Sequence, residues 1–259
     1  MATTMTGKTV QAINTAPVKS LGLSHPQSVH VGPAGILEDR RFCVVDEHGK
    51  MVTQREIGML VQVRTEYRPD PERLALRFPD GAVAEGTPEP GETVATRVWG
   101  RDVAGRVVVG NWAEALSEFC GKPLRLVRAE ELGGYLDEFP VSLLSQASVE
   151  ELGRQPWGKI ASDGRRFRPT LLLTGCQPHE EDSWLNRRVQ VGKELRLRVV
   201  ARDPRCAITT HDPDTGERDA DTLRVILSYR PHPKTAYFGV YAIVEQPGTV
   251  AVGDSVTTS

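Results

Sequence analysis

The sequence predicts a mainly β protein with a few short helices, arranged as barrels or as a sandwich. The 259 residues include 24 glycines and 18 prolines, and this frequency of turn formers favours many short strands over a helical bundle. About seven short apolar patterns fill the first half of the chain, with few helical interruptions between them. We therefore expect helices only as short segments between strands.

The strands of the first half follow short apolar or alternating runs that are separated by turn-forming residues. Turns are expected at Gly32-Pro33-Ala34-Gly35, His48-Gly49, Asp80-Gly81 and Gly100-Arg101. Strands are predicted at residues 8–15, 28–31, 41–46, 51–54, 60–67, 74–78, 93–99 and 103–109.

Three helices and six further strands are predicted in the remainder. The first helix covers residues 112–119, with Asn111 as N-cap and Glu114 three residues on, as in a capping box. Ser148 and Glu151 form the same pattern at a second helix, residues 148–152, and a third covers 222–229. Strands are predicted at residues 124–127, 170–173, 189–191, 195–201, 239–244 and 250–256. The segment Asp212-Pro213-Asp214-Thr215-Gly216 is a dense turn signal.

Length and composition limit the organisation of the chain. A chain of this length forms one large domain or two small ones, and we expect two, residues 1–128 and 129–259. Hydrophobic residues make up 39% and charged residues 25%, as in ordinary globular proteins. The net charge of −2 argues against a general nucleic-acid binder, which would be basic.

No targeting or membrane segment is expected. The first ten residues, MATTMTGKTV, contain no apolar run and no Arg-rich amphipathic stretch, and no window of the chain approaches 18 apolar residues. A cytoplasmic protein without membrane attachment is predicted. Its cysteines, at positions 43, 120, 176 and 206, are far apart, which argues against a zinc ribbon or a ferredoxin-type cluster and favours free thiols.

Four polar strings could carry chemistry, whereas common nucleophile and phosphate-loop motifs do not occur and the six histidines do not cluster. Lys19-Ser20 and Asp39-Arg40 border predicted strands, and Arg168 with Thr170 leads into a fully apolar strand. Arg205-Cys206 is the fourth, and an adjacent cation favours a thiolate, which is both a nucleophile and a soft metal ligand. Each string alone is explained by a solvated surface, an ion pair or a structural cysteine. Together they suggest a large anionic ligand held near a thiolate.

The ordered set of such strings resembles the MOSC family, the domain named after the C-terminus of molybdenum-cofactor sulfurases. The arrangement is similar to the two-part form, a MOSC N-terminal β-barrel followed by a MOSC β-barrel, found in the mitochondrial amidoxime-reducing component and its bacterial relatives. The matching segments, which span nearly the whole chain, are Pro17-Val18-Lys19-Ser20, Asp39-Arg40, Gly49, Met51-Val52-Thr53, Phe167-Arg168-Pro169, Glu181-Asp182-Ser183-Trp184, Arg205-Cys206, Thr209-Thr210, Asp212-Pro213-Asp214-Thr215-Gly216, Phe238-Gly239, Tyr241, Pro247-Gly248 and Val252-Gly253-Asp254.

The resemblance implies a pyranopterin molybdenum cofactor. Cys206 would be the protein thiolate on molybdenum and the catalytic position. Lys19, Ser20, Arg40 and Arg168 would hold the pterin and its phosphate. The resemblance also places Thr170, Arg205 and Tyr241 at the cofactor, with Arg205 as adjacent support.

The implied activity is a two-electron reduction of N-hydroxylated small molecules that releases water. The sequence has no cysteine cluster for a ferredoxin domain, so electrons would come from a separate ferredoxin- or flavoprotein-type donor. The chain departs from the amidoxime reducers at three places. Those proteins have Asn at the position of Thr170, a Thr-Ser pair at the positions of Glu138 and Phe139, and Ser at the position of Pro204. These differences bear on the form of the cofactor and on the range of substrates.

Three alternatives stay open at this point. The first is a sulfur transferase that carries a persulfide on Cys206. The second is a non-enzymatic carrier that binds the pterin cofactor and hands it on. The third is a β-barrel in which Cys206 is structural. A metal-binding thiolate is needed by neither a carrier nor a structural barrel, so Cys206 favours the reductase first and the transferase second.

Overall fold

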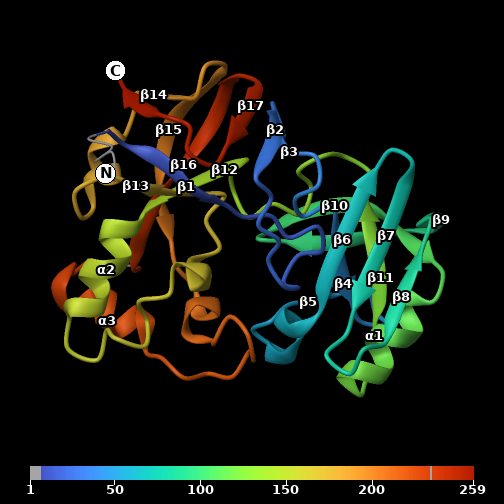
Figure 1. Cartoon of the computed structure of the whole chain (residues 1–259). Coiled ribbons are helices and arrows are strands. Elements are labelled where there is room, and N and C mark those ends of the chain that lie inside the picture. The colour runs from blue at the N-terminus through green and yellow to red at the C-terminus, as the bar shows by residue number, and fades with distance from the viewer. Residues whose placement is uncertain (1–6, 234) are drawn as a thin grey trace.

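The computed structural model describes residues 7–233 and 235–259, and most of this part of the chain that lies in regular structure is strand. Only three α-helices occur in it, α1 (Trp112–Cys120), α2 (Gln146–Arg154) and α3 (Thr222–Tyr229). The predicted class, mainly β with a few short helices, is confirmed. Figure 1 shows two lobes side by side, one with α2 and α3 and the other with α1.

The first lobe contains a seven-stranded sheet that curls into a nearly closed barrel. Its strand order is β1 (Thr9–Ile13), β13 (Leu171–Thr174), β12 (Val141–Ser145), β16 (Tyr237–Gln246), β15 (Leu195–Pro204), β14 (Arg188–Val191) and β18 (Val256–Thr258). The two edges approach each other: Val10 N donates to Asp254 O at 2.9 Å, and Val256 N donates to Lys8 O at 2.8 Å. Closure of this kind satisfies backbone groups that an open edge would expose.

Strand β12 lies between two hydrophobic cores, which explains why its five residues are all buried. Val141 and Leu143 belong to the barrel core, whereas Leu144 packs with the apolar faces of α2 and α3. Because side chains alternate along a strand, one strand can serve both cores. A strand buried on both faces has no alternating pattern, and this strand was not predicted from the sequence.

The second lobe is built from two antiparallel sheets. The larger has the order β5 (Met51–Val52), β4 (Phe42–Val45), β11 (Arg125–Ala129), β10 (Arg101–Val109) and β9 (Glu89–Val98). The smaller has the order β6 (Arg64–Pro69), β7 (Glu72–Arg77) and β8 (Val83–Gly86). Helix α1 inserts Trp112 and Leu116 into the core between them.

The N-terminal segment connects the two lobes. Strand β1 pairs with β13 in the barrel, and β2 (Ser28–Gly32) pairs with both β17 (Gly248–Ala251) and β3 (Gly35–Ile36). Strands β1 and β2, from the first half of the sequence, therefore pair with strands of the second half. The division of the chain into two domains at residue 128 stays a prediction. The loops that leave β1 and β3 enter the space between the lobes, which positions the candidate site.

Most predicted elements occur within a few residues of their expected ends, but two predicted strands and the cap bonds of two helices differ. Residues 60–67 begin as a 3-10 helix, η1 (Gly58–Gln62), because backbone bonds such as Val63 N to Leu60 O close locally before β6 starts. Residues 250–256 are broken by a turn at Gly253, whose φ is +92°. Helix α2 begins earlier than expected, with Ser145 as the N-cap that accepts from Ser148 N, and Asn111 makes no side-chain cap bond at α1. Among the described helices, none has the length and apolar character needed to cross a bilayer.

Candidate functional site

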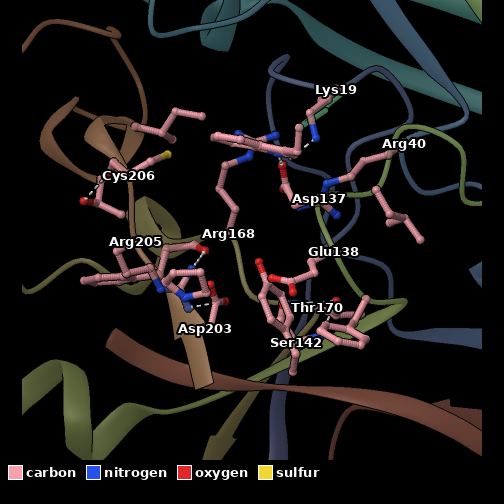
Figure 2. A pocket seen from close by; sticks show the side chains of 18 of the residues that line it. Lys19, Arg40, Asp137, Glu138, Ser142, Arg168, Thr170, Asp203, Arg205 and Cys206 are labelled. Atoms are coloured by element: carbon pink, nitrogen blue, oxygen red, sulfur yellow. Dashed lines mark hydrogen bonds and ion pairs between the residues drawn. The ribbon is translucent and has the colours of Figure 1, made fainter. Parts of the chain in front are cut away.

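A cavity of about 590 Å³ lies where loops of the two lobes meet. Six basic side chains and three carboxylates line it, so its wall is positively charged on balance. Every site residue predicted from the sequence lines this one cavity: Lys19, Ser20, Arg40, Arg168, Thr170, Arg205, Cys206 and Tyr241. Figure 2 shows Arg168 between Cys206 on one side and Lys19, Arg40 and Asp137 on the other. Chain segments far apart in sequence thus converge here, and the roles of these residues stay predictions.

Backbone pairing brings Lys19 and Arg40 to the same wall. Lys19 N donates to Phe42 O at 2.8 Å, and Arg40 N donates to Ala16 O at 2.8 Å. Ser20 and Arg40 both have left-handed backbones, with φ of 74° and 49°. Non-glycine residues adopt this conformation at a cost, so the surrounding hydrogen bonds must hold it.

The Lys19 ammonium is buried and is held by two acceptors. It donates to Tyr135 O at 2.8 Å and to Asp137 Oδ1 at 2.7 Å. Burial lowers the pKa of Lys19, with Arg40 adding to the effect and Asp137 opposing it. Burial would raise the pKa of Asp137, but Lys19 and Arg40 outweigh it and hold that pKa below its usual value. Each group of the pair therefore favours the charged form of the other.

Arg40 has a carboxylate partner, whereas Arg168 has none. The Arg40 guanidinium bonds the adjacent Asp39, whose other oxygen accepts from Ala16 N at 2.7 Å. Arg168 donates to Leu21 O at 2.7 Å and, within the described residues, forms no ion pair. Burial, together with Arg40, lowers the pKa of Arg168 to about 10. Asp39 and Asp137 compensate this half-buried cation only in part, and an anion in the cavity would pair with it directly.

Cys206 presents its thiol to the cavity at the start of the 3-10 helix η4 (Ala207–Thr210). Its carbonyl accepts from Thr209 N at 3.2 Å and from Thr209 Oγ1 at 3.1 Å, which fixes the backbone behind the thiol. The other three cysteines do not line the cavity. Burial raises the pKa of Cys43 to about 12, of Cys120 to about 11 and of Cys176 to about 12. Among the four cysteines, only Cys206 is placed to bind a ligand in the cavity.

Arg205 supports the wall rather than the thiol. Its guanidinium donates to Phe238 O at 2.6 Å and Phe167 O at 2.9 Å, and it lies 2.6 Å from Asp203. Among the described residues, no hydrogen bond or ion pair joins it to Cys206. The sequence-based expectation that Arg205 acts on the thiol as a neighbouring cation therefore has no support in these contacts. Its contacts tie strand β16 to the loop before β13.

Asp203 and Tyr241 form the floor of the cavity with Thr170. Burial raises the pKa of Asp203 to about 7, although Arg205 and the Tyr241 hydroxyl oppose the rise. A proton is thus retained on this carboxyl near neutral pH. The Thr170 hydroxyl accepts from Ser142 N at 3.0 Å, and Thr170 N donates to Ser142 Oγ at 2.9 Å. Thr170 is therefore engaged within the protein and shapes the wall.

Asp137, Asp203 and Trp99 are among the cavity residues that were not singled out from the sequence. Asp203 lies three residues before Cys206, and this proximity was the one available signal. Trp99 lies in the turn between β9 and β10, whereas Asp137 lies in the segment before β12, and nothing in their sequence neighbourhoods indicates that the fold brings them together. The Trp99 indole N–H donates to Asp137 Oδ1 at 2.8 Å.

Comparison with known proteins identifies relatives along the whole chain. A family model described as the MOSC domain matches residues 127–257, and one described as the MOSC N-terminal beta barrel domain matches residues 7–123. Mitochondrial amidoxime-reducing component 1 of Mus musculus is 31% identical over 273 residues, which cover 93% of this chain and 79% of that protein. The Homo sapiens protein of the same name is 30% identical, with coverage of 93% and 80%. Mitochondrial amidoxime reducing component 2 of Bos taurus is 32% identical over 259 residues, covering 86% and 74%.

Proposed function

Because the chain belongs to the MOSC family, with a MOSC N-terminal β-barrel domain before its MOSC domain, we propose that it is a molybdenum-cofactor-dependent reductase of N-hydroxylated compounds. One observation carries the proposal: Arg168 is a half-buried cation that forms no ion pair among the described residues, and it shares a cavity with the thiol of Cys206. An anionic ligand that also contains a thiophilic metal satisfies both groups at once. The names of the relatives, amidoxime-reducing components, supply the reaction class.

The residues present fit a pyranopterin cofactor. A cavity of about 590 Å³ lies within the range of small-molecule and cofactor sites. Its wall has six basic side chains against three carboxylates, and two of the basic ones, Arg40 and Arg166, are already paired with Asp39 and Asp219 outside the lining. Lys19 pairs with Asp137 and Arg205 pairs with Asp203, so among the described residues Arg101 and Arg168 are left without an ion pair. Of these two, Arg168 is the residue that the family resemblance assigns to the phosphate. Cys206 adds a soft sulfur ligand, which molybdenum prefers to oxygen-only sites.

The roles of the side chains follow from their surroundings. Lys19, Ser20, Arg40 and Arg168 would hold the phosphate and pterin, and Cys206 would be the protein ligand of the metal. Thr170 and Tyr241 would contribute to the wall beside the pterin, and Arg205 fixes that wall through two carbonyl groups. When bound, the cofactor supplies two-electron exchange between an electron donor and the substrate.

The overall reaction balances as a two-electron, two-proton reduction. The N–O bond of the substrate breaks, the nitrogen product keeps the carbon skeleton, and the oxygen leaves as water. The two electrons come from a separate electron-donor protein of the ferredoxin or flavoprotein class. Asp203, whose carboxyl retains a proton near pH 7, lies in the wall of the same cavity. A cytoplasmic location stays a prediction from the sequence.

The test is the molybdenum content per chain, measured by elemental analysis after expression in a host that makes the cofactor. Wild type, Cys206→Ser and Cys43→Ser are purified in parallel, the last being the matched control for loss of a thiol outside the cavity. We expect close to one molybdenum per chain in wild type and Cys43→Ser, and much less in Cys206→Ser. Loaded wild-type protein should then reduce benzamidoxime to benzamidine with a chemical electron donor.

Two results would overturn the proposal. Wild-type protein without molybdenum would exclude the reductase and leave sulfur transfer through Cys206 as the next reaction to assay. Cys206→Ser protein with full metal content and full turnover would show that the thiol is not the ligand.

A further inference from the structure

A second, smaller hollow adjoins the main cavity. Four residues line both: Lys19, Trp99, Asp137 and Ile208. Ile208 lies only two residues after Cys206 in the chain, and Cys206 lines the main cavity that the hollow adjoins. The hollow has a volume of about 380 Å³, and its remaining wall comes from the segment around β5 and from the end of β9. A ligand at Cys206 therefore has a neighbouring space into which its far end can extend.

Basic side chains dominate this second hollow. Lys50, Arg55 and Arg97 line it together with His48. Arg97 pairs with Asp102 at 3.1 Å, and His48 lies 3.6 Å from Glu47. In contrast, neither Lys50 nor Arg55 forms an ion pair with a carboxylate anywhere in the described parts of the chain. These two cations are free to bind an anion that enters from solvent.

The two carboxylates of the hollow are already engaged. Glu56 accepts from Thr53 Oγ1 at 2.6 Å and from Thr53 N at 3.0 Å. Asp137 accepts from Lys19 and from the Trp99 indole. The charge of Arg55 helps to lower the pKa of Glu56, but neither carboxylate forms an ion pair with Lys50 or Arg55. An incoming carboxylate would form charge-assisted hydrogen bonds with them.

Trp99 forms an aromatic wall between the two spaces. Its side chain is 57% exposed, its backbone has a left-handed φ of 47°, and its indole is fixed by the bond to Asp137. The Arg55 guanidinium lies 4.9 Å from the centre of the indole ring. The guanidinium lies over one face of the ring, and an exposed tryptophan held in this way offers its other face to an aromatic ligand, with the cation close by.

We infer that the second hollow binds the anionic end of the substrate, and that the enzyme prefers aromatic N-hydroxylated compounds that carry a carboxylate remote from the N–OH group. Lys50 and Arg55 bind the carboxylate, and Trp99 packs against the ring. The inference deepens the proposed function and rests on it for the identity of the reacting group. Nothing in the binding of the anion depends on turnover.

The test compares two probes on the oxidised, cofactor-loaded protein, in which no turnover occurs. Benzamidoxime is neutral, and 4-carboxybenzamidoxime adds the carboxylate. Kd values are measured by isothermal titration calorimetry for wild type and for the double variant Lys50→Ala/Arg55→Ala. A second double variant, Lys122→Ala/Lys193→Ala, removes two exposed lysines that do not line either space and controls for net charge.

We expect wild type and the Lys122→Ala/Lys193→Ala control to bind the carboxylate probe about tenfold more tightly than the neutral probe. In Lys50→Ala/Arg55→Ala the ratio should fall to about one, with the Kd of the neutral probe changed less than about twofold. Equal affinity for both probes in wild type, or a preference that survives in Lys50→Ala/Arg55→Ala, would overturn the inference. Failure of the reductase proposal would be seen separately, as a carboxylate preference in binding with no reduction of either probe.

Discussion

The Lys19 ammonium lies 2.7 Å from the Asp137 carboxylate at the wall that the two spaces share. The same carboxylate oxygen, Oδ1, accepts from the Trp99 indole at 2.8 Å. One acceptor thus joins a cation of the proposed cofactor cavity to the aromatic wall of the proposed substrate hollow. Asp137 compensates the charge of buried Lys19. Its removal should therefore disturb both the main cavity and the second hollow.

Asp137→Asn should lower the free energy of unfolding by about 1 kcal/mol at pH 7, a modest figure because the Asp137 side chain is partly exposed. The folded protein holds the pKa of Asp137 below its usual value. The charge therefore stabilises the fold above about pH 4, the region of the unfolded pKa, and this contribution is lost as the pH falls further. The difference between variant and wild type should shrink in that acidic range.

Urea unfolding at pH 7 and at pH 3 measures both differences. Asp102→Asn serves as the control, because Asp102 and its partner Arg97 are each 69% exposed and should contribute little. A loss for Asp137→Asn that is the same at both pH values would contradict the assigned charge.

Arg168→Ala should lose cofactor without losing stability. Among the described residues, the half-buried guanidinium has only Leu21 O as an acceptor, and desolvation together with Arg40 lowers its pKa, so its charge contributes little to the fold without an anion. We expect molybdenum content to fall at least about tenfold, while the free energy of unfolding of cofactor-free protein changes by less than about 1 kcal/mol. Lys193→Ala, on the exposed surface, should change neither. Unchanged metal content in Arg168→Ala would make Arg168 a structural residue.

Arg205→Ala should show the opposite pattern. Its removal leaves the Phe238 and Phe167 carbonyls without their donor and Asp203 without its cation. Losses of this kind in a buried site cost about 2–4 kcal/mol. Chemical unfolding measures the loss, and molybdenum per folded chain should fall less than in Arg168→Ala. A destabilisation below about 1 kcal/mol would show that the wall does not depend on Arg205.

The strands and helices could be predicted from the sequence wherever their burial is one-sided. The alternating run of β15 and the amphipathic pattern of α3 are examples, whereas β12, buried on both faces, has no pattern to detect. The site residues matched by family resemblance do meet in one cavity. Asp137 and Trp99 could not be predicted, because their role depends on the meeting of the β9–β10 turn with the loop before β12. The contacts of Arg205 depend likewise on Phe238, which is 33 residues away.

Asp203→Asn should change how stability varies with pH. Burial raises the pKa of Asp203 to about 7, above its value of about 3.9 in the unfolded chain. Between about pH 4 and pH 7 the folded protein keeps a proton that the unfolded chain releases, so this group lowers stability as the pH rises through that window. The slope is at most about 1.4 kcal/mol per pH unit, and Asp203→Asn should remove it.

Unfolding of cofactor-free wild type and variant at half-unit steps from pH 4.5 to 7.5 gives the difference curve. The same curve for Asp102→Asn should be flat, because that carboxylate is exposed. A flat difference curve for Asp203→Asn would show that Arg205 keeps Asp203 ionised throughout.

Thiol reactivity should single out Cys206. The thiols of Cys43, Cys120 and Cys176 have raised pKa values of about 11 to 12, so at pH 8 almost none is thiolate, the form that reacts. Cys206 lines the open cavity. Native, cofactor-free protein should therefore take up one equivalent of iodoacetamide, and protein in denaturant should take up four.

Mass spectrometry of Cys206→Ser should show no native labelling. Cys43→Ala should still take up one equivalent, with a loss of about 1–2 kcal/mol in the free energy of unfolding. Rapid native labelling of Cys120 or Cys176, or a protected Cys206, would contradict the assignment of the reactive thiol to the cavity.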